Sequence, residues 1–358
     1  MHNNFETLTI SDVRRETRDC VSVAFALPDN LKEKFRFKQG QYITVRTTLN
    51  GEDIRRSYSI CSSPLDSELR IAIKKVPDGL FSTYANEQLK KGDSLQVMTP
   101  MGRFFSELNP AASNHYIAFA AGSGITPVFS IIKTTLQTEP NSHFTLIYGN
   151  RNRYSIIFRE QLEALKNKYI GRFNIIYILS REKTDAPIHF GRIDAAKTSS
   201  LCGILIDPAQ AAAIFLCGPE EMVFSVKEVL EQKQVDPKKI HFELFTAGKK
   251  TGAARPQRSA ESREVKSRIS VKQDGTSFEF DLGFEGDSIL EAALKQGADL
   301  PFACKGGVCC TCKAKLIEGE VEMELNYGLE PDEIEQGFIL TCQSHPIAEK
   351  VMIDFDVK

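Results

Sequence analysis

The sequence predicts a multidomain protein of mixed β and α/β class: an antiparallel β-barrel, then a doubly wound parallel sheet, then a small C-terminal domain. Three observations predict this order. Short strands of alternating polarity fill the first part of the chain, apolar strands alternate with helices in the middle, and four cysteines near the end have the spacing of a metal site. A chain of 358 residues is too long for one ordinary core and suits two or three domains.

The first region, residues 1–108, is expected to form the barrel. Runs such as Tyr-Ile-Thr-Val at 42–45 and Leu-Arg-Ile-Ala-Ile at 69–73 have strand character, and Gly40, Gly51 and Gly92 separate such runs. Short strands at this spacing favour a small antiparallel barrel.

Two motifs in the barrel indicate a flavin site. Arg-Ser-Tyr-Ser at 56–59 offers an arginine for a phosphate group, an aromatic ring that can stack on the isoalloxazine, and a hydroxyl that can bond its N5 edge. Gly-Leu-Phe-Ser-Thr at 79–83 is expected to open a helix whose N–H groups face a pyrophosphate. Each motif alone also fits an ordinary strand or turn, so the flavin interpretation depends on the rest of the chain.

Residues 109–246 are expected to form the doubly wound sheet. An apolar strand at 115–121 leads into the turn Gly-Ser-Gly-Ile-Thr-Pro at 122–127 and a helix at 128–136, with Thr126 as the cap and Pro127 in the first position. Apolar strands at 144–148, 173–179 and 212–217 alternate with helices at 158–168 and 220–232. Ligands bind at the carboxyl ends of such strands, so the glycine turn predicts a nucleotide site, although it lacks the third glycine of the usual fingerprint.

The ends of two strands favour NADPH over NADH. Ser180 and Arg181 follow the strand at 173–179, and Arg151 ends the neighbouring strand. A hydroxyl and guanidinium groups suit a dianionic 2′-phosphate, whereas an acidic residue would suit the free ribose of NADH. Glu182 would weaken this preference if it turned inward, and the alternative for Arg181 is an ordinary surface arginine.

A linker is expected at residues 247–265, which contain glycine, proline and charged residues but few large apolar side chains. The last domain, residues 266–358, has strand candidates at 268–271 and 277–282. A helix is expected to begin after Ser288, as a capping box with Glu291, and to end at Gly297.

The cysteines of the last domain predict a [2Fe–2S] cluster. Cys304, Cys309 and Cys312 have the spacing C-x4-C-x2-C, and Cys342 supplies a distant fourth thiolate, which is the plant-type pattern. Zinc is the alternative, but zinc ribbons favour two separated C-x2-C pairs. Cys310 is expected to be a neighbour and not a ligand.

The loop between the first two ligands contains Gly306 and Gly307. Residues without a Cβ can adopt left-handed dihedral angles and let N–H groups approach the sulfur atoms. A tight loop of this kind is therefore expected around the cluster.

Charge is uneven along a chain whose net charge is only −2. Residues 266–358 contain 9 Lys and Arg and 18 Asp and Glu, a net charge of −9, so the preceding residues carry +7. This asymmetry favours docking between domains or onto a basic partner, and a merely solvated acidic face is the alternative. It gives no support to nucleic-acid binding. The absence of an apolar span, and nine cysteines of which four have metal-ligand spacing, favour a cytoplasmic protein without membrane association.

Five motifs, in this order, resemble the ferredoxin–NADP reductase superfamily: 56–59, 79–82, 122–127, Cys-Gly-Pro at 217–219 and His-Phe-Glu-Leu-Phe at 241–245. With a plant-type ferredoxin domain of β-grasp fold at the C-terminus, the resemblance covers nearly the whole chain. The domain order and the runs at 136–140, 145–151 and 296–308 are similar to the reductase subunits of bacterial phenylacetyl-CoA epoxidases. That similarity implies FAD, NADPH, one [2Fe–2S] cluster and a separate di-iron oxygenase as electron acceptor. FMN is the alternative flavin, and other oxygenases are alternative acceptors, because related reductases use them.

The resemblance also implies roles for individual residues. The flavin motifs are matched by Arg56, Tyr58, Ser59, Gly79, Phe81 and Ser82. The nucleotide site is matched by Gly122, Gly124, Thr126, Pro127, Cys217 and Gly218, joined by Arg151, Ser180 and Arg181. Glu243 and Phe245 match the end of the reductase domain, near the flavin, and Ser59, Cys217 and Glu243 are the expected catalytic residues.

These expectations describe an electron-transfer enzyme. A nicotinamide delivers two electrons as hydride and the cluster accepts one, so a flavin must stand between them. None of the six histidines has a glutamate three residues before it, so the Glu-x-x-His pairs of a di-iron bundle are missing and the oxygen chemistry belongs to another protein. A redox-sensing electron carrier without significant turnover is the alternative class.

Overall fold

The computed structural model describes residues 5–245 and 266–357. The chain divides into two compact units, one of residues 5–245 and one that contains the C-terminal region. Each unit is described by itself. The expected linker at 247–265 lies outside the described residues.

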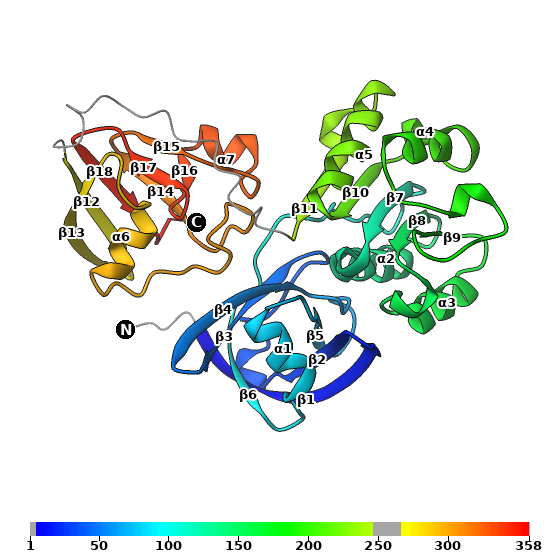
Figure 1. Ribbon diagram of the computed structural model, residues 1–358, viewed down its shortest axis with the longest axis horizontal. Coiled ribbons are helices and arrows are strands. Elements are labelled where there is room, and N and C mark those ends of the chain that lie inside the picture. Colours follow the sequence, from blue (N-terminus) through cyan, green and yellow to red (C-terminus); the bar gives the residue numbers. More distant parts are fainter. Residues whose placement is uncertain (1–4, 246–265, 358) are drawn as a thin grey trace. The chain divides into compact units, whose positions relative to one another are not determined.

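Six antiparallel strands in the order β4-β3-β6-β1-β2-β5 form the first half of the larger unit, drawn in blue and cyan in Figure 1. The strands and the one helix are β1 (Phe5–Thr17), β2 (Cys20–Ala26), β3 (Tyr42–Leu49), β4 (Glu52–Ser59), β5 (Leu69–Lys74), α1 (Leu80–Glu87) and β6 (Ser94–Met98). A bridge between Ile60 and Ile71 connects the two edges of this sheet, so the strands curl into a barrel. Alternate side chains such as Ile43, Val45 and Val97 fill its interior, as the period of a half-buried strand requires.

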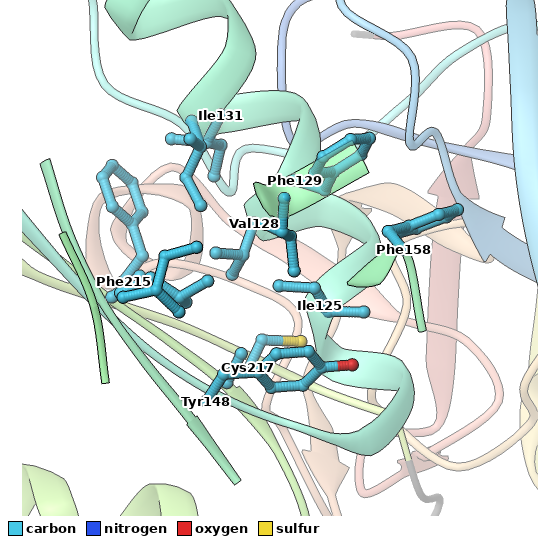
Figure 2. Packing of buried hydrophobic residues seen from close by; sticks show 14 of the residues in the cluster. Ile125, Val128, Phe129, Ile131, Tyr148, Phe158, Phe215 and Cys217 are labelled. Carbon is cyan, nitrogen blue, oxygen red and sulfur yellow. The ribbon is translucent and has the colours of Figure 1, made fainter. Parts of the chain in front are cut away.

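Five parallel strands in the order β11-β10-β7-β8-β9 form the second half. The elements are β7 (His115–Ala121), α2 (Ile125–Thr138), β8 (His143–Asn150), α3 (Arg159–Lys168), β9 (Phe173–Leu179), α4 (Ala195–Ile204), β10 (Ala213–Gly218), α5 (Glu220–Gln232) and β11 (Ile240–Leu244). Helices lie on both faces of the sheet (Figure 1), which confirms the doubly wound prediction. Figure 2 shows the core between α2 and the sheet, where Ile125 and Val128 pack toward Tyr148 and Cys217.

The start of α2 differs from the prediction. The helix begins at Ile125, after a single 3-10 turn at Gly122–Gly124, and no side chain caps it. Thr126 is therefore the second residue of the helix, and its hydroxyl donates to the Ser123 carbonyl over 3.0 Å. Thr126 was expected to be the cap because threonine is common at that position. In the structure the 3-10 turn leads directly into the helix, and no side chain acts as a cap.

Polar contacts fasten the barrel to α2 through the loop that follows β4. Ser130 Oγ donates to the Ser62 carbonyl over 2.6 Å, and the hydroxyls of Ser63 and Thr134 lie 2.9 Å apart. Lys133 pairs with Asp66 at the end of the same loop. These contacts hold the two halves of the unit in one arrangement.

The smaller unit has a five-stranded mixed sheet in the order β13-β12-β18-β14-β16 and a two-stranded sheet of β15 and β17. Its elements are β12 (Lys266–Gln273), β13 (Thr276–Gly283), α6 (Ile289–Lys295), β14 (Lys313–Glu318), β15 (Val321–Met323), α7 (Pro331–Glu335), β16 (Phe338–Leu340), β17 (Ser344–Pro346) and β18 (Lys350–Asp354). Ile289, Leu290 and Ala293 of α6 pack against the sheet in one core. Ser288 caps α6 by accepting from the Glu291 N–H over 3.3 Å, as predicted, and Gly297 follows the helix with φ of 86°.

A buried carboxylate stabilises the segment that enters the parallel sheet. Glu139 is fully buried and accepts hydrogen bonds from the Tyr116 hydroxyl, from Ser142 Oγ over 2.7 Å and from the Asn109 N–H over 2.8 Å. A buried polar group without hydrogen-bond partners would be costly, so this network contributes to the stability of the unit.

Replacing Glu139 with Ala should therefore destabilise the larger unit. The change leaves two hydroxyls and one N–H without their acceptor, and we expect a loss of about 3 kcal/mol and a melting temperature lower by roughly 10 °C. Thermal unfolding followed by circular dichroism measures both quantities. Glu52→Ala, at an exposed position of β4, is the control and should change stability by less than about 0.5 kcal/mol. Equal effects of the two changes would contradict this account.

Candidate functional site

The flavin motif lies on β4 with its three side chains in different surroundings. Arg56 is exposed, and its guanidinium donates to the Arg55 carbonyl over 2.8 Å. Tyr58 is half-buried, and its ring lies 5.6 Å from that of Phe81. Ser59 is buried. A positive group at the surface, a supported aromatic ring and a hydroxyl thus follow one another along the strand.

The second flavin motif forms the start of α1. Ser82 Oγ accepts from the Val76 N–H and donates to the Gly79 carbonyl, which closes the turn before the helix. A Cβ on Gly79 would lie 2.3 Å from Ser82 Oγ and 2.5 Å from a methyl group of Val76, so a larger residue would displace these side chains. Phe81 is almost fully buried beneath Tyr58, so its side chain supports the site from below. The first N–H groups of α1 have no acceptor within the helix and can meet an anion, which fits the pyrophosphate of FAD.

The barrel and the sheet meet at Ser59 and Glu243. Ser59 Oγ donates to Glu243 Oε2 over 3.3 Å, although 184 positions separate the two residues in the chain. Glu243 pairs in register with Cys217 of β10, so all three expected catalytic residues lie in one region. The Cys217 side chain is fully buried beside Tyr148 (Figure 2), and burial raises the pKa of its thiol well above the usual value.

Glu243 is a half-buried residue whose carboxyl group nevertheless lies among protein atoms. Desolvation raises its pKa from 4.5 to about 8, and the Ser59 hydrogen bond opposes this only in part. The carboxyl group therefore holds a proton near neutral pH, next to the hydroxyl expected to face the flavin.

This pKa predicts a pH-dependent contribution to stability. A carboxyl whose folded-state pKa is raised stabilises the fold fully below pH 4.5, and that stability is lost as the pH rises through about 8. We expect the melting temperature of the wild type to fall relative to that of Glu243→Gln across this range, because the glutamine does not ionise. Thermal unfolding of both proteins over a pH series checks this. Parallel curves would show that Glu243 titrates normally.

The glycine turn at 122–124 lies against the end of β10. A Cβ on Gly124 would stand 2.0 Å from the Cys217 carbonyl oxygen, so no other residue fits. Gly122 has φ of 55°, and its carbonyl accepts from the Tyr148 hydroxyl over 2.9 Å. Thr126 and Pro127 are buried in the first turn of α2, so they help to form the turn but their side chains do not face solvent.

Two further predicted residues lie at the ends of β10 and β11. A Cβ on Gly218 would meet the Met222 side chain at 2.7 Å, so this position too is closely packed. Phe245 follows β11 directly and is 38% exposed, which leaves its ring available to a ligand.

The predicted phosphate-binding residues come together at the ends of β8 and β9. The Arg181 N–H donates to the Arg151 carbonyl over 2.8 Å, and Ser180 donates to the Asn150 carbonyl. Both arginine side chains are exposed, and within residues 5–245 no ion pair holds either of them. Two unpaired guanidinium groups and a hydroxyl at one edge fit a 2′-phosphate.

Glu182 was the residue expected to weaken the preference for NADPH if its side chain turned inward. In the structure Arg153 binds this side chain. Its carboxylate accepts from the Arg153 N–H over 2.8 Å and pairs with the Arg153 guanidinium. These bonds lower the pKa of Glu182 and fix its side chain on Arg153. The sequence did not identify Arg153, because only the folded turn brings it to Glu182.

In the C-terminal unit the cysteine loop wraps around Cys304. Its Sγ accepts from the N–H groups of Gly306 and Cys309, each over 3.3 Å. Lys305 has φ of 51° and Gly307 has φ of 72°, so the left-handed turns expected at two glycines occur at a lysine and one glycine. A Cβ on Gly307 would stand 2.7 Å from the Leu325 carbonyl oxygen, so glycine is required there.

The four predicted ligand thiols lie in contact with one another. Hydrogen bonds from Cys309 and Cys342, with help from the nearby N–H groups, lower the pKa of the Cys304 thiol, and Cys312 also bonds to Cys342. In the part of the chain that the structure describes, no three His, Cys, Asp or Glu side chains converge as ligands of one ion. Cys304 bonds to both Cys309 and Cys342, and Cys342 bonds to Cys312, so the four thiols lie close enough together to serve the two irons of one cluster. The residues therefore fit a [2Fe–2S] cluster.

Two residues beside the cluster ligands, Cys310 and Gln343, form hydrogen bonds to nearby backbone carbonyls. Cys310 Sγ donates to the Gly328 carbonyl, which lies outside the ligand loop. Gln343 was missed by the sequence analysis, since only its place beside Cys342 could have indicated it. Its amide donates to the carbonyls of Lys305 and Cys342 and so connects the fourth ligand to the loop.

Family models match three successive regions of the chain. They are an oxidoreductase FAD-binding domain at residues 7–105, an oxidoreductase NAD-binding domain at 119–228 and a 2Fe-2S iron-sulfur cluster binding domain at 271–346. The site and these matches define an NAD(P)H-dependent flavin and iron–sulfur oxidoreductase. Its cofactors are FAD, a pyridine nucleotide and a [2Fe–2S] cluster, so the FMN and zinc alternatives are not supported.

Relatives that span the whole chain narrow this class. One of the subunits of the 1,2-phenylacetyl-CoA epoxidase from Escherichia coli is 45% identical, with 99% of this chain and 98% of the relative covered. The ferredoxin reductase component of 3-ketosteroid-9-alpha-monooxygenase from Rhodococcus rhodochrous is 31% identical, with 97% and 96% covered. The chain belongs to this family of oxygenase reductase components.

A solved structure shows the same three-domain fold. Phthalate dioxygenase reductase superposes with a TM-score of 0.59 at 24% identity, and 98% of each chain is covered. The predicted order of barrel, parallel sheet and ferredoxin domain is thereby confirmed.

Proposed function

We propose that this chain is the NADPH-dependent reductase of a multicomponent oxygenase, and that its acceptor is a di-iron epoxidase acting on phenylacetyl-CoA. The observation that carries the proposal is the 45% identity, over essentially the full length, to the epoxidase component of Escherichia coli. The more distant likeness to a ketosteroid monooxygenase component supports a second candidate, another oxygenase served by the same layout. A redox sensor is disfavoured because both relatives are components of oxygenases.

The chain's own residues prepare the electron transfer. Bound FAD supplies the conversion of a two-electron hydride into single electrons, which the cluster takes one at a time. Tyr58 would flank the isoalloxazine, the start of α1 would bind the pyrophosphate, and Arg56 would bind a phosphate oxygen. Ser59 would orient the N5 edge, with Glu243 holding a proton behind it.

The remaining assignments belong to the same proposal. Cys217 would shape the nicotinamide edge from below, and Cys304, Cys309, Cys312 and Cys342 would bind the cluster. The other residues proposed to form the cofactor sites, through backbone groups or by supporting them, are Gly79, Phe81, Ser82, Gly122, Gly124, Thr126, Pro127, Arg151, Ser180, Arg181, Gly218 and Phe245. Domain boundaries at 108, 246 and 265 follow from the same motifs. Among the described residues no helix is long and apolar enough to cross a membrane, and we propose a cytoplasmic location.

The preference for NADPH depends on Arg181. Replacing it with Ala removes a charge-assisted contact to the 2′-phosphate, so the apparent KM for NADPH should rise about tenfold while that for NADH hardly changes. Steady-state reduction of ferricyanide with each nucleotide measures this. Lys91→Ala, at an exposed position of the barrel, should alter neither value. Equal losses with both nucleotides would mean that Arg181 supports the fold or a shared part of the ligand.

The order of the carriers can be tested by removing the C-terminal unit. A protein ending at residue 245 keeps a compact unit of its own. It should still reduce ferricyanide with NADPH but should reduce cytochrome c poorly, because the cluster is the expected exit for single electrons. Full-length protein lacking one ligand, as Cys309→Ser, should behave in the same way. Undiminished cytochrome c reduction by both would show that electrons bypass the cluster, and negligible turnover by the wild type would favour a sensor.

A further inference from the structure

The side chain of Gln343 is buried beside the fourth proposed cluster ligand, and the residue is only 5% exposed. Its Nε2 donates to the Lys305 carbonyl over 3.1 Å and to the Cys342 carbonyl over 2.9 Å. The same nitrogen lies 3.7 Å from Cys342 Sγ, which is within the range of an N–H···S hydrogen bond. One amide group therefore contacts both the cysteine loop and a ligand sulfur.

The bond to Lys305 orients one peptide unit of the cysteine loop. A trans peptide unit is planar, and its C=O and N–H groups point in opposite directions. The Lys305 carbonyl faces Gln343, so the N–H of the same unit, which belongs to Gly306, points the other way. That N–H donates to Cys304 Sγ over 3.3 Å. Gln343 and Cys304 thus bind the two ends of a single peptide unit.

This peptide unit needs support because Lys305 has a left-handed backbone. Its φ of 51° lies in a region that residues with a Cβ rarely adopt. A return of Lys305 to an ordinary φ would turn the peptide and carry the Gly306 N–H away from the sulfur. Gln343 is itself fixed, because its N–H donates to the Leu340 carbonyl and its carbonyl accepts from the Glu324 N–H, each over 2.9 Å.

We propose that Gln343 raises the reduction potential of the cluster, by its own bond to Cys342 Sγ and by holding the Gly306 N–H on Cys304 Sγ. This inference rests on the proposed cluster ligands and adds a positioning residue to them. Reduction of a [2Fe–2S] cluster adds negative charge that its sulfur atoms share, and N–H donors stabilise that charge. These hydrogen bonds therefore favour the reduced state and make the cluster a better acceptor of electrons from the flavin.

The test uses Gln343→Met, which keeps nearly the shape of the side chain but has no N–H group. Wild type and variant, as FAD-loaded full-length proteins, are compared by redox titration followed by electron paramagnetic resonance of the reduced cluster. We expect the equilibrium to shift about tenfold toward the oxidised cluster, which lowers the midpoint potential by about 59 mV for one electron. Gln296→Met, at an exposed position just after α6, is the matched control and should keep the wild-type potential.

A second measurement separates this effect from a general loss of structure. Iron and acid-labile sulfide per chain should be the same in Gln343→Met and the wild type. If the methionine variant does not retain the cluster, Gln343→Asn takes its place in the titration. Its amide is one methylene shorter and falls short of the Lys305 carbonyl, so its potential should also be lower than that of the wild type.

An unchanged potential in the Gln343 variant that holds a cluster would overturn the proposal, as would an equal fall in Gln296→Met. Loss of the cluster from both Gln343 variants would also overturn it, because Gln343 would then serve cluster binding and not the potential. Failure of the ligand assignment gives a different result: Cys342→Ser would keep the wild-type resonance spectrum, whatever the potential of Gln343→Met.

Discussion

The contact between the loop after β4 and helix α2 determines where a flavin on the barrel can meet a nucleotide on the sheet. Ser62 and Ser63 of the loop bond to Ser130 and Thr134 of the helix with little exposure to solvent. Buried hydrogen bonds of this kind give a fixed geometry more than a large net energy. Because α2 begins at the glycine turn, the same contact positions that turn relative to the flavin motif at the end of β4.

The second constraint is the close packing of the backbone of the glycine turn against the backbone at the end of β10. Gly124 fits against the Cys217 carbonyl only because it has no Cβ, and Cys217 is in register with Glu243. The turn, β10 and β11 are therefore packed against one another, and the Glu243 side chain reaches Ser59 of the barrel. Desolvation at this junction keeps the carboxyl protonated near neutral pH, which would be impossible for the same residue at an open surface.

Much of this could be predicted from the sequence because the informative features are local. The strand at 173–179 and the helix at 220–232 were predicted with the bounds they have, since apolar runs and turn residues mark them. The predicted start of α2 was wrong because a 3-10 turn and a capped helix have similar sequence patterns. The ion pair of Arg153 with Glu182, the amide of Gln343 and the burial of Phe81 were missed or unspecified, since each depends on distant residues meeting in the fold.

The central claim is that electrons pass from NADPH to FAD and only then to the [2Fe–2S] cluster. Anaerobic stopped-flow mixing of the full chain with NADPH, with freeze-quenched samples read by electron paramagnetic resonance, tests it most directly. We expect flavin absorbance to fall first, the reduced-cluster signal to follow, and protein stripped of FAD to show no cluster reduction. Cluster reduction at an unchanged rate without FAD, or a cluster that stays oxidised while the flavin is reduced, would contradict it.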